Sequence, residues 1–106
     1  MVKLVILYKK PDYIPDFEQN YSANLALLEK LPGIIRRQAN VVLGGPAGSS
    51  PYYRFLELYF EDFQALDVAM RSPEGVAAGQ NLMQFAGNLV ELIFVDVFED
   101  DTPPQP

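Results

Sequence analysis

The sequence predicts a single α+β domain built on a four-stranded antiparallel sheet with helices against one face. Strand and helix patterns follow in the order β-α-β-β-α-β, which is two β-α-β halves joined by a hairpin, the ferredoxin-like arrangement. The length of 106 residues suits one domain. The balance of 49% hydrophobic and 21% charged residues is typical of a folded globular protein.

The first part of the chain predicts a strand followed by a helix. The run from Val2 to Lys9 is rich in β-branched and aliphatic residues, carries apolar side chains on both faces and stops before Pro11-Asp12. A helix is expected to begin at Pro15 and to stop at Pro32-Gly33. Its apolar residues, at helical spacing, are Phe17, Tyr21, Leu25, Leu28 and Leu31.

The middle of the chain predicts a β-hairpin. Residues 34–43 form its first strand, and the Gly- and Pro-rich stretch 44–51 forms its loop, which lacks the lysine and following helix of a phosphate-binding loop. The second strand covers residues 52–61, where apolar residues alternate. One face of this strand would carry Leu56, Leu58 and Phe60, and the other Tyr53, Phe55, Glu57 and Tyr59.

The last part predicts a broken second helix and a final strand. Helical patterns cover residues 62–70 and 75–86, and Ser72-Pro73-Glu74 between them is a helix start. The last strand is expected over residues 89–98. The domain therefore spans residues 1–98, and the acidic, proline-rich residues 99–106 predict a disordered tail.

Charge and composition exclude several classes of function. The net charge of −6 argues against nucleic-acid binding, because the basic pairs Lys9-Lys10 and Arg36-Arg37 do not form a patch that attracts phosphates. With no cysteine and no histidine, the chain cannot use a thiol nucleophile, His-assisted catalysis, an imidazole zinc site or His-ligated haem. We expect no metal and no cofactor.

The first apolar run gives evidence on where in the cell the protein is located. Val2 to Tyr8 is far too short to span a membrane, and it lacks the charged lead and cleavage site of a signal peptide. We therefore expect a cytoplasmic protein without a membrane partner.

The sheet predicts a homodimer. Helices cover one face of a four-stranded sheet, but each predicted strand has large apolar or aromatic side chains on both sides. A monomer would leave Tyr53, Phe55 and Tyr59 as an apolar patch in water, which soluble monomers avoid. A second copy packed across a two-fold axis would cover that patch.

Asn24 is the polar residue that points most clearly to a site. It projects about 20° from Phe17 and about 40° from Leu28, in the middle of the apolar stripe of the first helix. Burying an amide without hydrogen bonds costs about 1–3 kcal/mol, so Asn24 needs a partner. That partner is either a backbone carbonyl in the core or a ligand in a pocket between helix and sheet.

Other candidate residues lie on the strands and the last helix. Glu57 between Phe55 and Tyr59 is the candidate general base, unless it pairs with a cation on the next strand. By parity, Glu91 and Asp96 fall on opposite faces, so at most one shares a cavity with Glu57. The tyrosines could donate to a substrate oxygen or simply pack; the remaining candidates for substrate binding are Tyr8, Tyr21, Tyr53, Phe55, Tyr59 and Phe85.

Several stretches resemble EthD-domain proteins. They are Met1 to Asp12, Phe17 to Tyr21, Leu31-Pro32-Gly33, and Ser72-Pro73-Glu74-Gly75 leading to Phe85-Ala86. The resemblance implies a dimeric α/β barrel, in the superfamily that also holds cofactor-independent monooxygenases, polyketide cyclases and muconolactone isomerases. The name-giving members accompany a cytochrome system that degrades ethyl tert-butyl ether.

The resemblance has one departure at the first helix. Many EthD-like members carry a histidine and then a proline ahead of the Leu-Pro-Gly stop. Aligned on that stop, Asn24 takes the place of the histidine and Ala26 that of the proline. Asparagine can orient or polarise a ligand but does not exchange protons near neutral pH.

Three functions stay open from the sequence. The first is a pocket protein that binds a small hydrophobic or aromatic metabolite in a catabolic pathway. The second is a cofactor-independent monooxygenase, cyclase or isomerase that acts on a small aromatic or alicyclic compound, with Glu57 as base. The third is a structural module whose cavity is filled by its own side chains.

Overall fold

The computed structural model describes residues 1–98, which form four strands and three helices. The predicted tail at 99–106 lies outside the described residues. Within residues 1–98, no helix combines the length and the apolar character needed to cross a bilayer. In chain order the elements are β1 (Val2–Lys9), α1 (Ile14–Leu28), β2 (Arg36–Val41), β3 (Tyr52–Phe60), α2 (Phe63–Arg71), α3 (Pro73–Ala86) and β4 (Val90–Asp96).

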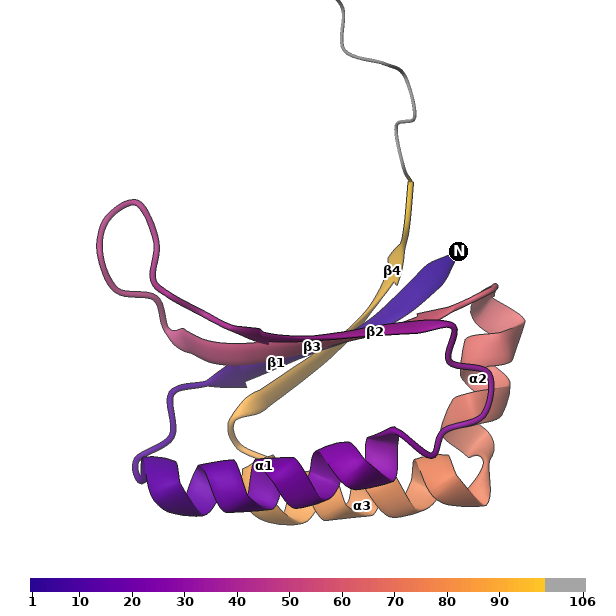
Figure 1. Ribbon diagram of the computed structural model, residues 1–106, viewed down its shortest axis with the longest axis horizontal. Helices are drawn as coiled ribbons and strands as arrows, with labels where there is room; N and C mark the ends of the chain where they lie inside the picture. The colour runs from indigo at the N-terminus through magenta and orange to yellow at the C-terminus, as the bar shows by residue number, and fades with distance from the viewer. Residues whose placement is uncertain (99–106) are drawn as a thin grey trace, which may run out of the picture.

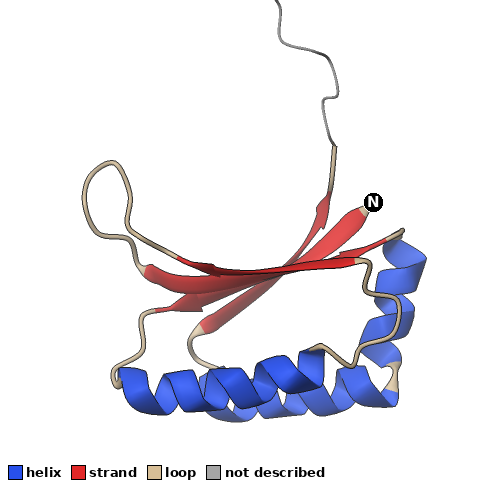
Figure 2. Cartoon of the chain, viewed as in Figure 1, coloured by secondary structure: helices blue, strands red, loops and turns tan. Residues whose placement is uncertain are grey.

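The strands form one antiparallel sheet in the order β2-β3-β1-β4. All three described helices lie on one side of it: α1 and α3 run side by side beneath the sheet, and α2 stands at one end (Figures 1 and 2). The opposite side, here called the bare face, carries no helix of the described chain. The predicted ferredoxin-like fold is confirmed.

The core lies between the sheet and the helices. Alternate residues of the central strands point into it, and Leu4, Ile6, Leu56, Leu58 and Phe60 are at most 1% exposed. Because side chains alternate along a strand, the residues between them point to the bare face. The predicted division of Leu56, Leu58 and Phe60 from Phe55, Glu57 and Tyr59 is therefore confirmed.

Several predicted boundaries differ from the structure by one to three residues; β4, for example, covers Val90–Asp96 of the predicted 89–98. α1 ends at Leu28 rather than at Pro32, and Leu31 is buried from the turn that follows, with Gly33 in the left-handed region at φ 84°. The first hairpin strand is shorter than residues 34–43 because regular pairing with β3 covers only Arg36–Val41.

The break in the second helix has a clear local cause. The Ser72 hydroxyl donates to the carbonyl of Ala69 at the end of α2 and accepts from the amide of Gly75 in the first turn of α3. Pro73 follows as the first residue of α3. A side chain at Gly75 would collide with the Ala69 carbonyl oxygen, so the two helices meet at a residue without a Cβ.

Candidate functional site

The structure divides the predicted site residues between the two sides of the sheet. Asn24, Tyr21 and Phe85 lie on the helix side, whereas Phe55, Glu57 and Tyr59 lie on the bare face. A pocket lined by both Asn24 and Glu57 is therefore excluded, because the sheet itself separates them.

Aromatic side chains gather between the sheet and the first half of α1. Phe17 is their centre, with its ring centroid 5.7 Å from Tyr8, 6.0 Å from Tyr21, 5.6 Å from Tyr53 and 5.9 Å from Phe85. These five residues, from β1, α1, β3 and α3, are called the aromatic cluster below. Tyr8 and Tyr21 are almost inaccessible to solvent, and Tyr53 and Phe85 are half-buried.

Tyr53 departs from the predicted alternation. Tyr8 pairs with Arg54 but Lys9 pairs with Tyr52, so Tyr53 is the extra residue of a β-bulge. Its hydroxyl donates to the Glu18 carboxylate on α1. The bulge thus turns Tyr53 to the helix side, away from Phe55 and Tyr59.

Asn24 is fully buried between α1 and α3. Its amide nitrogen donates to the carbonyl oxygen of Ala78 and to Oδ1 of Asn81, both at 3.0 Å. These bonds fix which end of the Asn24 amide is the nitrogen, because a carbonyl oxygen accepts a hydrogen bond only from an N–H group. Its own Oδ1 has no partner among residues 1–98. Asn24 is thus tied to a backbone carbonyl, yet it keeps one unused acceptor.

Further buried polar atoms near the aromatic cluster lack partners. Within the described chain these are the hydroxyls of Tyr8 and Tyr21 and the Nε of Arg54. Leaving one such atom buried and unpaired costs about 1–3 kcal/mol. Several buried, unpaired polar atoms close together are typical of a place where a ligand or an ordered water supplies the missing hydrogen bonds.

Arg54 and Glu18 form an ion pair at the edge of the cluster. Nη2 of Arg54 lies 2.9 Å from Oε1 of Glu18, and the guanidinium carbon is 4.6 Å from the centre of the Tyr21 ring. The hydrogen bond from Arg54 lowers the pKa of Glu18. Burial raises the pKa of Tyr21 and of Tyr8, and the charge of Arg54 offsets part of each rise.

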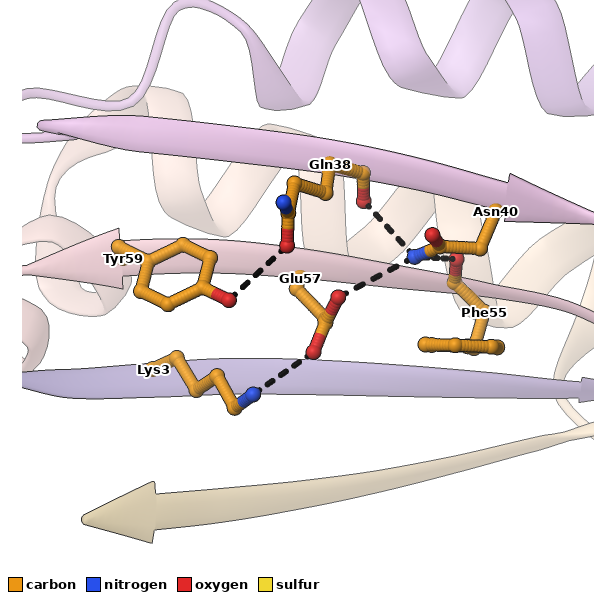
Figure 3. Close-up of polar contacts among 6 residues, drawn as sticks. All are labelled: Lys3, Gln38, Asn40, Phe55, Glu57 and Tyr59. Carbon is orange, nitrogen blue, oxygen red and sulfur yellow. Dashed lines mark hydrogen bonds and ion pairs between the residues drawn. The ribbon is translucent and has the colours of Figure 1, made fainter. Parts of the chain in front are cut away.

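The bare face carries a polar network across β1, β3 and β2 (Figure 3). Glu57 accepts from Lys3 at 2.7 Å and from Asn40 at 3.2 Å. The bond to Glu57 raises the pKa of Lys3. With its amide turned from the orientation drawn, Gln38 donates to Glu57 at 3.1 Å and to Tyr59 at 2.9 Å.

This network answers the question about Glu57. Its carboxylate pairs with a lysine on the next strand, as one of the two sequence hypotheses held, and the amides of Asn40 and Gln38 donate to its other oxygen. Glu91, opposite Leu7, shares the bare face with Glu57, whereas Asp96 pairs with Val2 on the helix side. Glu91 is engaged by Tyr52 and Lys9 at the sheet edge.

Toward β4, the side chains beside this network on the bare face are apolar, whereas Arg36 on β2 lies over the Tyr59 ring. Val5 and Ile93 pair beside Glu57, and Leu7 and Phe55 pair in the next row. Ile93 is 46% exposed on the edge strand. The face is thus apolar toward β4 and polar toward β2, rather than apolar throughout.

Sequence reasoning passed over Arg54 and Glu18 as site residues. A signal was present, because Arg54 has the same parity as Leu56 and Leu58 and so points a charge toward the core. Its partner could not be found from spacing, since Glu18 lies on another element 36 residues away.

Comparisons with known proteins bear on this arrangement. The EthD domain model matches residues 13–87. The chain belongs to the EthD family. An EthD family protein from Bacillus halodurans C-125 is 35% identical, with a TM-score of 0.90 over 92% of this chain and 99% of that one.

Other similar proteins extend the comparison. An uncharacterized 11.0 kDa protein in the thcB-thcC intergenic region of Rhodococcus erythropolis is 28% identical over 91% of this chain and 94% of its own length. Hydroxynitrile lyase from Passiflora edulis shares the fold alone, at 13% identity and a TM-score of 0.71 over 97% and 96% of the two chains. Several further structures with this fold are described as dimeric ferredoxin-like proteins.

The unpartnered hydroxyls give a stability prediction for the EthD-family chain. We expect Tyr8→Phe and Tyr21→Phe to leave the free energy of unfolding unchanged or to raise it by up to about 1 kcal/mol, because no hydrogen bond is lost. Tyr53→Phe is the matched control in the same cluster and should lower it by about 1–2 kcal/mol, since its bond to Glu18 disappears. Urea denaturation measures all three; a loss as large for Tyr8→Phe as for Tyr53→Phe would contradict the assignment.

The Arg54–Glu18 pair gives a pH prediction. Because the pKa of Glu18 is lower in the folded chain, its stabilising contribution is complete above the unfolded pKa, near 4.5, and is lost as the pH falls through the folded value. Between pH 5 and pH 3, Glu18→Gln should therefore lose less unfolding free energy than the unmodified chain. Denaturation at stepped pH tests this, with the exposed Glu61→Gln as control; equal slopes for Glu18→Gln and the unmodified chain would refute it.

Proposed function

We propose that this EthD-family protein binds a small hydrophobic or aromatic metabolite of a catabolic pathway between its helix layer and its sheet. The observation that carries the proposal is a set of buried polar atoms, on Tyr8, Tyr21, Asn24 and Arg54, that find no partner within residues 1–98 and lie beside aromatic rings. Ligand sites commonly combine apolar walls with a few placed polar groups. Tyr53 and Phe85 are half-buried, so they are the members of the aromatic cluster that solvent reaches, and we expect the ligand to enter beside them.

The pKa values of the titratable groups at this site favour binding over the enzymatic alternative. A cofactor-independent monooxygenase, cyclase or isomerase needs a group that exchanges protons near neutral pH. Here the pKa of Glu18 is lowered from 4.5 by Arg54, and burial raises those of Tyr8 and Tyr21 above 10. All three shifts lead away from neutrality, and Asn24 does not titrate.

The proposal includes a homodimer formed through the bare face. The polar network on that face is satisfied within one chain, so covering it costs little, and Val5, Leu7, Phe55 and Ile93 supply apolar area. Structures with this fold that are described as dimeric support the proposal of a dimer. We also propose a cytoplasmic setting, which suits a chain without cysteine.

The ligand site can be located by NMR. In a screen of small aromatic and alicyclic compounds on the ¹⁵N-labelled chain, we expect hits to perturb the amides around Tyr21, Asn24 and Phe85. The same hits should bind Glu57→Gln with unchanged affinity, because Glu57 lies across the sheet. A screen without hits, or perturbations confined to Lys3, Glu57 and their neighbours on the bare face, would overturn the proposed function.

The dimer can be tested by sedimentation equilibrium. We expect twice the chain mass of 11.9 kDa at micromolar concentration. Ile93→Lys should weaken the dimer at least tenfold, because it places a charge among apolar residues of the interface. Val68→Lys is the matched control on α2, where Val68 is 56% exposed, and should remain dimeric. A monomeric unmodified chain would refute the assembly.

A further inference from the structure

The hydrogen-bonding chemistry of the atoms without partners in residues 1–98 indicates which class of ligand the site would bind. This inference rests on the proposed function. We infer that the ligand is a neutral ring compound with a carbonyl oxygen, and that the hydroxyls of Tyr8 and Tyr21 donate hydrogen bonds to that oxygen beside the guanidinium of Arg54. Each step below follows from where these three side chains lie and from what already occupies them.

The three donors come from different elements but lie together. Tyr8 is on β1, Arg54 is its cross-strand partner on β3, and Tyr21 is on α1. The rings of Tyr8 and Tyr21 are 5.4 Å apart, and the Arg54 guanidinium carbon lies 4.6 Å from the centre of the Tyr21 ring. The same groups carry the unpartnered hydroxyls and Nε, so the unused hydrogen bonds are concentrated in one place.

The balance of donors and acceptors favours a ligand that accepts. Guanidinium Nε–H can only donate, and a phenol donates through its single O–H. A carbonyl oxygen has two lone pairs and no proton, so it can take two of these bonds at once. A hydrocarbon of the same shape would leave all three donors unpaired, at a cost for each. The Asn24 Oδ1 is an acceptor and does not take part in this recognition.

The charge balance favours a neutral ligand over a carboxylate. The positive charge of Arg54 is already met by Glu18 at 2.9 Å, and Tyr53 also donates to that carboxylate. The pair leaves the site with no net charge. A carboxylate ligand would compete with Glu18 for Arg54, or bring an uncompensated charge beside side chains that are at most 4% exposed, Tyr8, Phe17 and Tyr21.

Three probes of similar shape separate these classes: acetophenone (a neutral carbonyl), ethylbenzene (apolar) and benzoate (an anion). By NMR titration of the full chain, we expect acetophenone to bind at least tenfold more tightly than either of the others. Tyr8→Phe and Tyr21→Phe should each weaken acetophenone five- to tenfold and leave ethylbenzene unchanged. Tyr52→Phe, which removes a hydroxyl bonded to Glu91 at the sheet edge, is the matched control and should bind acetophenone as the unmodified chain does.

The outcomes distinguish this inference from the proposed function. Equal binding of acetophenone and ethylbenzene, tighter binding of benzoate, or undiminished acetophenone affinity in both Tyr→Phe variants would overturn the carbonyl assignment. Binding of none of the three probes would overturn it as well. The proposed function is decided separately by the wider screen, because an apolar or anionic hit that maps to the aromatic cluster would leave it standing.

Discussion

The antiparallel pairing of β1 with β3 at the centre of the sheet is the interaction on which the rest of the structure depends. From Val2 opposite Phe60 to Tyr8 opposite Arg54, successive pairs point alternately to the helices and to the bare face. Pairs of residues with even sequence numbers, such as Leu4 and Leu58, point into the core. Pairs with odd numbers, such as Val5 and Glu57, point to the bare face. The molecule therefore has two separate chemical environments, with one sheet between them.

The helix-side environment combines a packed aromatic cluster with polar groups that residues 1–98 do not satisfy. Buried polar atoms are nearly always hydrogen-bonded in native proteins, so several exceptions in one place need an explanation. A β-bulge contributes to the arrangement because it brings Tyr53 to the side of Glu18 and Arg54. The ion pair with Glu18 then neutralises the charge of Arg54 without occupying its Nε.

On the bare face, by contrast, the polar side chains of the network have hydrogen-bond partners. Within residues 1–98, Lys3, Glu57, Asn40 and Gln38 satisfy one another, so a second copy could cover this network without leaving its groups unpaired. This differs from a surface that is merely apolar, because a polar network also restricts how two copies can be aligned. A carboxylate held in this way is better suited to assembly than to proton transfer.

The order of elements, the strand Val2–Lys9 and the alternation of Leu56, Leu58 and Phe60 were determined by the sequence itself, because side-chain periodicity and turn residues are local properties. Local periodicity also picked out Asn24, since its angle to Phe17 and Leu28 is fixed by the geometry of one helix. Tertiary structure alone decided that Asn24 and Glu57 lie on opposite sides of the sheet, that a bulge turns Tyr53 toward Glu18, and that Glu57 pairs with Lys3. Those outcomes depend on register and on contacts between elements distant in sequence, and these are set by packing of the whole domain rather than by any single segment.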